Sequence, residues 1–317
     1  MLICIGEILV DIFKDNKTRT ILPGGAPFNV ACNATLYTKD VSLYGAVGKD
    51  TNGQLLIKTA KEKNFKELHI KELEDRHTSE AIVTLTNGER SFRFNRALGA
   101  DYMLDTSDID ISSIKDNDIV HIGSLMLSYD NGVNFYHDLI KQIRAKTHAK
   151  ISFDINYRDD IFSSPKEAKN IFINALKEAD ILKFSLEEIS LLTNEKDIVK
   201  GLNKLLAPHQ VAVVTLGKDG SLFYKDNHTV KVDSIPVSPV DTTGAGDAFY
   251  SYFLASLVNH PNLINNDKEI IYYLRRANVV GAITTLKKGA INTAPREEEI
   301  DLFLKKQTRF ELEKFSA

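Results

Sequence analysis

Short apolar segments alternate with helix-like segments along most of the chain, and this alternation limits the folds open to it. The expected strands are Leu2–Ile5, Val41–Tyr44, Ile119–Ile122, Ile151–Phe153, Ile181–Lys183 and Val211–Thr215. The expected helices include Phe28–Tyr37, Gly132–Ala145, Pro165–Ala179 and Ala245–Val258. Several of the strands are apolar at consecutive positions, which is typical of strands covered by helices on both faces. The sequence therefore predicts an α/β fold with a doubly wound, mostly parallel sheet flanked by helices.

Two segments, at about residues 13–22 and 79–97, interrupt the alternation. The second contains Asn87-Gly88 between two runs of alternating apolar and polar residues, which is the pattern of a β-hairpin. We expect these segments to form a small β-sheet lid beside the main sheet. No repeat and no linker rich in Pro and Gly divides the 317 residues, so we expect residues 1–317 to form a single domain.

The segment Asp241-Thr242-Thr243-Gly244-Ala245-Gly246-Asp247 opens one of the expected helices. Gly244 and Gly246 allow a ligand to approach the backbone closely, and the first N–H groups of a helix attract an anion. Asp247, in the first turn, is then placed to accept a proton from an attacking hydroxyl. A helix capped by Thr243 would explain the Thr and the Asp, but not two glycines that each cost helix stability. We favour an anion site with Asp247 as a general base.

Polar residues also follow other expected strands and turns. Gly25 and Asn29 lie at the start of the first helix, where the Asn29 side chain has a ligand hydroxyl or a buried backbone group as its two candidate partners. Asp154-Ile155-Asn156-Tyr157-Arg158 and Lys183-Phe184-Ser185-Leu186-Glu187-Glu188 leave two strand ends. Ligands of open α/β sheets bind beyond such ends, and oxygen donors there suit hydrated Mg²⁺ and phosphates. Taken singly, each segment is equally well explained as an ordinary loop.

Bulk properties exclude several classes of protein. The net charge of -3 gives no basic footprint for nucleic acid. No apolar run reaches the ~18 residues of a membrane span, and the N-terminal segment lacks the basic start of a signal peptide. Cys4 and Cys32 show no metal-ligand spacing, so we expect buried free thiols in a cytoplasmic protein. No GxxxxGK[ST] or GxGxxG motif is present, which disfavours a Walker nucleotide site and a dinucleotide oxidoreductase.

Taken together, these segments resemble the ribokinase-like sugar kinases, also called the phosphofructokinase-B family, over nearly the whole chain. Residues 241–249, DTTGAGDAF, and residues 24–31, GGAPFNVA, match the two signature regions of that family. Gly6-Glu7 with Asp11, and Asp154-x-Asn156-x-Arg158, look most like a bacterial fructokinase. The resemblance implies transfer of the γ-phosphoryl group of ATP to a sugar hydroxyl, with D-fructose converted to fructose 6-phosphate.

The resemblance also implies a role for each site residue. Asp247 is the expected base, and the amides of Gly244, Ala245 and Gly246 are the expected anion hole. The residues expected to contact the sugar are Asp11, Gly25, Asn29 and Arg158. The residues expected to face ATP and its phosphates are Asn156, Lys183, Ser185, Thr215, Gly217, Gly220 and Asn278. Glu188 is expected to hold Mg²⁺ through water, and Asp241, the Thr243 carbonyl and Gly289 are expected to form a monovalent-cation site for K⁺. The lid is expected to form a homodimer interface.

Some alternatives stay open at this point. Arg90, Arg93 and Arg96 make the lid more cationic than a neutral sugar requires, which keeps 2-keto-3-deoxygluconate kinase in play, although exposed strand edges also favour such charges. A ribokinase or nucleoside kinase would differ near Asn29 and Phe92. Ser185 stands where the family usually has Asn, and fructokinases often share this smaller residue. Outside enzymes, a sugar-binding regulator could have kept the same fold.

Overall fold

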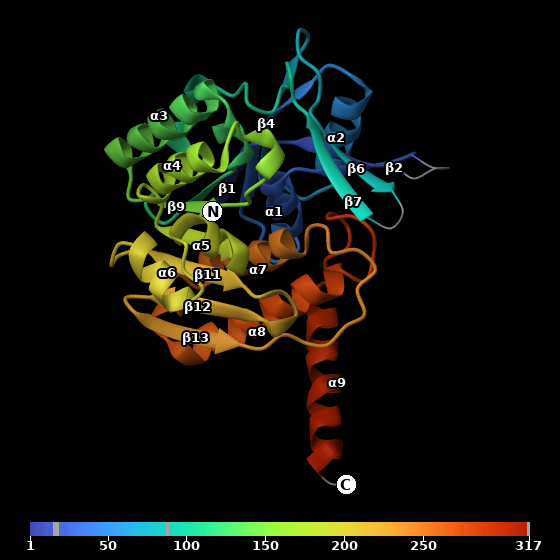
Figure 1. Ribbon diagram of the computed structural model, residues 1–317, viewed down its shortest axis with the longest axis vertical. Helices are drawn as coiled ribbons and strands as arrows, with labels where there is room; N and C mark the ends of the chain where they lie inside the picture. The colour runs from blue at the N-terminus through green and yellow to red at the C-terminus, as the bar shows by residue number, and fades with distance from the viewer. Residues whose placement is uncertain (15–18, 87–88, 316–317) are drawn as a thin grey trace.

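The computed structural model describes residues 1–14, 19–86 and 89–315, and nine strands within this part of the chain form one twisted sheet (Figure 1). The strand order is β13-β12-β11-β10-β9-β8-β1-β4-β5. The strands are β1 (Leu2–Ile5), β4 (Val41–Gly48), β5 (Glu67–Leu73), β8 (Ile119–Ile122), β9 (Lys150–Asp154), β10 (Ile181–Ser185), β11 (Val211–Thr215), β12 (Ser221–Lys225) and β13 (His228–Val232). All neighbours from β11 to β5 are parallel, and β12 and β13 add an antiparallel edge. The predicted fold class is confirmed.

Helices cover both faces of this sheet, as the apolar strands predict. One face carries α1 (Ala26–Ala34), α2 (Thr51–Lys61), α7 (Ala245–Asn259) and α8 (Asp267–Thr284). The other face carries α3 (Asp130–Lys146), α4 (Pro165–Leu176), α5 (Leu186–Thr193) and α6 (Ile198–Leu205). Alternate residues of β1 divide between the two cores, with Leu2 and Cys4 in the first and Ile3 and Ile5 in the second. This division is the two-residue period of a strand buried on both sides.

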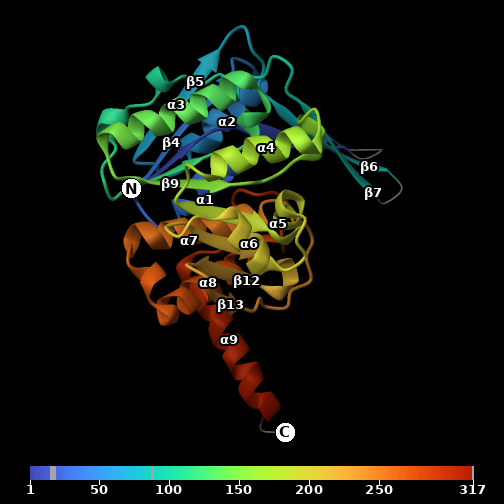
Figure 2. The same cartoon turned by 60° about the vertical axis from the view of Figure 1, so that its left-hand side comes forward.

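Short 3₁₀ turns and one further helix complete the described elements. The turns are η1 (Thr106–Asp108), η2 (Ile111–Ser113), η3 (Leu125–Ser128), η4 (Asp159–Ile161), η5 (Gly217–Asp219) and η6 (Leu263–Asn265). Helix α9 (Glu297–Phe315) starts against the first core, through the buried Ile300, and then extends away from the body (Figure 2). Over the residues described, no helix combines the length and apolar character needed to cross a membrane.

The expected lid is a separate four-stranded sheet in the order β3-β2-β6-β7. Its strands are β2 (Leu9–Lys14), β3 (Arg19–Gly24), β6 (Glu80–Thr86) and β7 (Glu89–Asn95), and β2 lies parallel to β6. The first predicted segment, residues 13–22, is too short, because β1 ends at Ile5 and a new strand begins at Leu9. The β6–β7 hairpin forms as predicted, with Thr86 opposite Glu89, whereas the expected turn residues Asn87-Gly88 lie outside the described residues.

Candidate active site

A cavity of about 590 Å³ lies between the small sheet and the carboxyl edge of the main sheet. Ten of the predicted site residues line it, namely Asp11, Gly25, Asn29, Asn156, Arg158, Lys183, Thr243, Gly244, Gly246 and Asp247. They come from β2, the start of α1, the ends of β9 and β10, and the start of α7. The carboxyl ends of parallel strands meet at this edge, which brings residues far apart in sequence to one place.

Asp247 lies in the first turn of α7, where its side chain reaches the cavity. The helix begins at Gly244, whose φ of 73° is in the left-handed region and whose absent side chain leaves room for Ala290. No side chain caps this end, so the alternative of a helix capped by Thr243 is wrong. The Ala245 N–H donates to the Thr242 carbonyl oxygen at 3.3 Å, so one of the three expected anion-hole amides already has a partner.

The Asp247 carboxylate is held by a side chain from the opposite helix. Asn29 Nδ2 on α1 donates a hydrogen bond of 2.8 Å to Asp247 Oδ2. Burial raises the pKa of Asp247 above its usual range and the charge of Asp154 adds to this, while Lys183, the Asn29 hydrogen bond and Arg158 oppose it. The Asn29 Oδ1 atom is buried and has no hydrogen-bond partner within the described residues. Since buried acceptors are rarely left unpaired, this atom is suited to a ligand hydroxyl.

Asp11 and Arg158 bring opposite charges to the same cavity. Asp11 projects from β2 beside Gly24, where a side chain would overlap the Asp11 carboxylate. Burial, with the charge of Asp247, raises the pKa of Asp11 to about 7, and Arg158 moderates this rise. Arg158 is exposed and donates to the Tyr157 carbonyl oxygen at 3.0 Å, so most of its donors have no partner within the described residues and suit a ligand.

Lys183 lies on β10 directly under the start of α7. Its Nζ atom is buried and donates to both oxygens of Asp154, at 2.8 and 2.7 Å. A side chain added at Gly246 would lie 3.6 Å from this Nζ, so the lysine borders the predicted anion site. The pKa of Lys183 is raised, because the nearby carboxylates of Asp154, Glu188 and Asp247 outweigh the effect of burial. A buried cation therefore supports negative charge at the helix start.

Ser185 and Glu188 form a capping box at the start of α5. Ser185 Oγ accepts the Glu188 N–H at 3.2 Å, and Glu188 Oε2 accepts the Ser185 N–H at 2.7 Å. Glu188 Oε1 accepts the Tyr157 N–H at 2.9 Å, which holds the turn after β9, where Asn156 has a φ of 40°. Both Glu188 oxygens thus bind backbone amides. This arrangement favours contact with an ion through water, because each carboxylate oxygen already accepts a backbone N–H and is held in place by it.

The other residues predicted to bind the nucleotide gather beyond the described lining of the cavity. Thr215 ends β11, and Gly217, with a φ of 57°, faces open space in η5. Gly220, with a φ of 101°, lies against the Val232 carbonyl, to which Asn278 Nδ2 donates at 3.0 Å. Asn278 thereby ties α8 to the end of β13. This group therefore surrounds one turn, with Gly217 as its open side.

Asp241, Thr243 and Gly289 are in direct contact. Asp241 Oδ1 accepts the Thr243 N–H at 3.0 Å and its hydroxyl at 2.7 Å, and Asp241 Oδ2 accepts the Gly289 N–H at 3.0 Å. The contacts join the loop before α7 to the loop before α9. The three residues expected to form a cation site are thus adjacent.

The two lid arginines whose side chains are described, Arg93 and Arg96, do not enter the cavity as an acidic sugar would require. Arg96 is buried and paired with Asp101 at 2.6 Å. Arg93 is exposed and alternates along β7 with Phe94, which lines the cavity, so Arg93 faces away from it. The side chains of Arg90 and Phe92 lie outside the described residues.

Two features of the site were not predicted from the sequence. The first is an apolar wall of Leu9, Ala81, Phe94 and Leu125, which comes from segments that meet only in the folded chain. The second is Glu7, whose carboxyl is fully buried and has no hydrogen-bond partner within the described residues. Burial raises the pKa of Glu7 to about 8. The sequence places Glu7 just after an expected strand, but no sequence pattern indicates that its carboxyl is buried.

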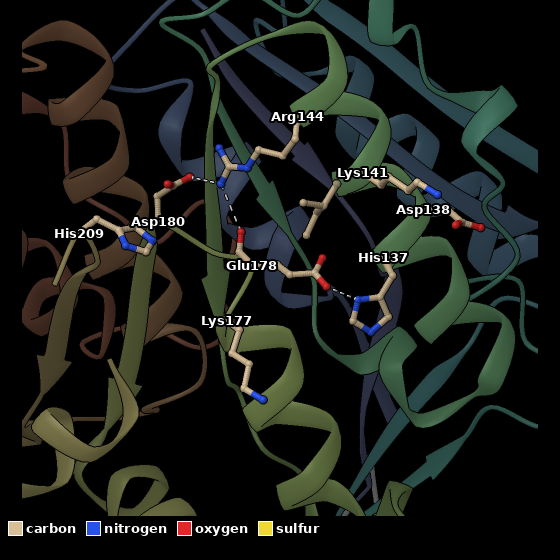
Figure 3. A pocket seen from close by; sticks show the side chains of 9 residues that line it. His137, Asp138, Lys141, Arg144, Lys177, Glu178, Asp180 and His209 are labelled. Carbon is tan, nitrogen blue, oxygen red and sulfur yellow. Dashed lines mark hydrogen bonds and ion pairs between the residues drawn. The ribbon is translucent and has the colours of Figure 1, made fainter. Parts of the chain in front are cut away.

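A second cavity, of about 530 Å³, lies at the amino edge of the sheet, where Asp180 and His209 precede β10 and β11 (Figure 3). In it, Arg144 of α3 pairs with Asp180 at 2.6 Å, and His137 Nδ1 lies 2.6 Å from Glu178 Oε1. Lys141 and Lys177 point away from one another (Figure 3). These charged groups therefore join α3 to the segment before β10 and do not converge on one point.

Comparisons with known proteins agree with this geometry. Residues 1–297 match the pfkB family carbohydrate kinase. The fructokinase of Vibrio alginolyticus is 32% identical over 303 residues, covering 94% of this chain and 97% of that protein. Fructokinase-1 of Zea mays is 32% identical over 314 residues, covering 95% of this chain and 96% of that protein. The crystal structure of fructokinase from Vibrio cholerae O395 in fructose, ADP and calcium ion bound form superimposes with a TM-score of 0.86 at 32% identity, covering 96% of this chain and 98% of that chain. The chain therefore belongs to the pfkB family of carbohydrate kinases.

Proposed function

We propose that this protein is a fructokinase that transfers the γ-phosphoryl group of ATP to D-fructose, giving fructose 6-phosphate. The observation that carries the proposal is Asp247, set at an uncapped helix start and held by Asn29 in the cavity beneath the small sheet. The fructokinases of Vibrio and Zea mays, similar over nearly the whole chain, support fructose as the sugar.

In this mechanism the chain binds and orients two substrates. Asp11, Asn29 and the Gly25 backbone contact the sugar, and Arg158 closes the site from its exposed position. The unpartnered Asn29 Oδ1 accepts a sugar hydroxyl, while its Nδ2 keeps the Asp247 carboxylate aimed at the reacting oxygen. Such positioning supplies a large share of catalysis in phosphoryl transfer.

Asp247 accepts the proton of the attacking hydroxyl as the oxygen bonds to the γ-phosphorus. The N–H groups at the start of α7, with Lys183 beneath them, stabilise the charge on the transferring group. Lys183 keeps its charge because Asp154 holds it at 2.7 Å. The raised pKa of Asp247 suits a base that must capture a proton.

Mg²⁺ bound with ATP would offset part of the phosphate charge. Asn156, Ser185 and Glu188 would face it through water, since both Glu188 oxygens already accept backbone N–H groups. Thr215, Gly217, Gly220 and Asn278 would line the nucleotide. Asp241, the Thr243 carbonyl and Gly289 would hold K⁺, and their mutual contacts support this grouping.

We propose that residues 1–317 form one kinase domain in which the small sheet acts as a lid. Phe94 supports this role, since its side chain lines the cavity and its N–H donates to Asp160 on the opposite rim at 3.2 Å.

The edge strands of the lid offer a surface for a homodimer. Sedimentation at micromolar concentration would detect the dimer, and a result showing only monomer would contradict it. The buried free thiols of Cys4 and Cys32 support a cytoplasmic location.

A coupled assay of ADP release with ATP, Mg²⁺ and a panel of sugars tests the proposal. We expect the highest kcat/KM with fructose and far lower values with ribose and 2-keto-3-deoxygluconate. A preference for the acidic sugar would assign a 2-keto-3-deoxygluconate kinase instead. No turnover with any sugar would favour a sugar-binding regulator.

A further inference from the structure

A buried arginine lies at the base of the lid with every nitrogen of its guanidinium hydrogen-bonded. Arg96 follows β7 and is only 3% exposed. Its Nε and Nη2 atoms donate to Asp101 Oδ2 at 2.8 and 2.6 Å. Its Nη1 atom donates to the Leu125 carbonyl oxygen at 3.0 Å and to Ser128 Oγ at 2.7 Å. The bonds join the lid to η3, on the main body of the protein.

Aromatic rings complete the setting of this arginine. Tyr102 and Tyr129 stack with ring centroids 3.9 Å apart. The Arg96 Cζ atom lies 5.6 Å from the Tyr102 centroid and 5.3 Å from the Tyr129 centroid. A guanidinium within about 6 Å of an aromatic face is attracted to it. Arg96 is therefore held in one orientation by hydrogen bonds and by packing.

The same cluster fixes the other end of the hairpin. Asp101 Oδ1 accepts a hydrogen bond from the hydroxyl of Ser79, the residue just before β6. The adjacent Thr78 is bound to Asp50, the N-cap of α2, through its N–H and its hydroxyl, each at 2.8 Å. Both feet of the β6–β7 hairpin, which leaves the body beside β2 (Figure 1), thus meet at the Arg96–Asp101 pair.

On its other side the cluster touches the wall of the sugar cavity. Leu125, whose carbonyl oxygen accepts from Arg96, packs with Leu9, Ala81 and Phe94 in a small apolar cluster. All four side chains line the cavity. Arg96 therefore links the fixed wall at Leu125 to the lid strands that carry Ala81 and Phe94.

Stability alone is a poor reason for this pair. Removing two charges from water carries a large desolvation cost, and apolar replacements of similar volume are often as stable or more so. The pair instead fixes the position of the hairpin base, because its forked hydrogen bonds are satisfied in only one arrangement of Arg96 and Asp101.

We propose that Arg96 is a positioning residue of the sugar site, which through Asp101 and Leu125 sets the lid so that Phe94 and Ala81 close over the sugar and exclude water. The proposal rests on the proposed kinase function. When the anchor is weakened, the sugar binds less tightly and water competes for the phosphoryl group, whereas ATP binding changes little because the nucleotide residues lie elsewhere.

The test compares Arg96→Lys, Ser79→Ala and the apolar double variant Arg96→Met/Asp101→Leu with the wild type. The measurements are the KM for fructose, the KM for ATP, and the rate of ATP hydrolysis without sugar relative to fructose phosphorylation. For Arg96→Lys and the double variant we expect the fructose KM and the hydrolysis ratio to rise on the order of tenfold, with the ATP KM within about twofold. Ser79→Ala should shift both quantities in the same direction by less. It removes one hydrogen bond, so it remains testable if a charge variant fails to fold.

Arg276 provides a matched control, because its contacts involve no residue of the lid or the cavity wall. Arg276 on α8 is likewise buried, paired with Glu297 and Asp301, and lies 5.3 Å from the Tyr272 ring centroid. Arg276→Lys should lower Tm without changing the fructose KM or the hydrolysis ratio. Folded anchor variants with an unchanged fructose KM and hydrolysis ratio would overturn the positioning role while leaving the kinase assignment intact. A wild-type chain that phosphorylates no sugar would overturn both.

Discussion

Asn29 and Asp247, 218 residues apart in sequence, form a 2.8 Å hydrogen bond between the first turns of α1 and α7. The bond joins the segments 24–31 and 241–249 at the wall of the cavity beneath the small sheet. The two polar atoms of the Asn29 amide differ in their surroundings, because Nδ2 donates to the Asp247 carboxylate and Oδ1 has no hydrogen-bond partner within the described residues.

Replacing Asn29 with Ala should remove both contacts while leaving the cavity otherwise intact. We expect kcat/KM for fructose to fall by roughly 10²-fold, since Asp247 loses its orientation and the sugar loses an acceptor. Steady-state kinetics check this, and ATP affinity measured by titration serves as the control. Unchanged kcat/KM would mean that the amide only fills space.

As pH is lowered, kcat should begin to fall at a higher pH than it would if the base were an aspartate with an ordinary pKa. Asp247 must be ionised to accept a proton, and burial raises its pKa, so kcat should rise with pH through a value above the usual range of Asp. The carboxylate of Asp11, with a pKa of about 7, should bind sugar hydroxyls best when ionised, so the fructose KM should increase below pH 7. Rate profiles from pH 5 to 9 measure both. A flat kcat over the whole range would contradict the assignment of the base.

Glu7 should make the stability of the fold depend on pH. Its pKa rises from the ordinary value of 4.5 to about 8 on folding. Between these values the folded chain holds a proton that the unfolded chain has released. The stabilisation is therefore complete below the lower value and is lost as pH rises through the higher one, by up to about 1.4 kcal/mol per pH unit.

Glu7→Gln removes this titration, so its unfolding free energy relative to the wild type should improve between pH 5 and pH 8 by on the order of a few kcal/mol. Denaturant unfolding at the two pH values measures the change. Equal differences at both would show that Glu7 does not hold the proton.

Gly244 should tolerate no side chain. Its φ is 73°, and an added Cβ would overlap Ala290. We expect Gly244→Ala to cost on the order of 2–4 kcal/mol of unfolding free energy and to lower kcat. Gly217→Ala is the matched control, because its φ of 57° carries a similar backbone cost but the space around it is open. Equal losses of stability in the two variants would refute the contact with Ala290.

The sequence predicts the main sheet well because each element carries its own signal. Leu2–Ile5 and Val211–Thr215 are apolar on both faces and match β1 and β11 residue for residue. The start of the first lid strand, β2, carries no such signal of its own. The run Ile8-Leu9-Val10 continues the apolar pattern of β1, and only the three residues from Gly6 to Ile8 separate the two strands.

The candidate site likewise contains residues that a local sequence pattern predicts and residues that it does not. The two glycines just before Asp247 predict that its carboxylate lies at the start of a helix, and this prediction does not depend on the rest of the fold. The burial of Glu7, the apolar wall around Leu125 and the pairing of Arg96 with Asp101 depend on contacts between distant segments, so no local pattern reports them. Arg96 is the clearest case. In the sequence its charge keeps an acidic sugar open as the substrate, whereas in the structure it is buried and does not line the cavity.

The measurement that tests the account most directly is the effect of Asp247→Asn on turnover and on ATP binding. The substitution keeps the shape of the side chain and its place beside Asn29, but the amide cannot act as a base. We expect kcat with fructose to fall by roughly 10²- to 10⁴-fold, while ATP affinity from calorimetry stays within a few-fold of the wild type. A variant with near-normal kcat would contradict the role of Asp247 and, with it, the proposed mechanism.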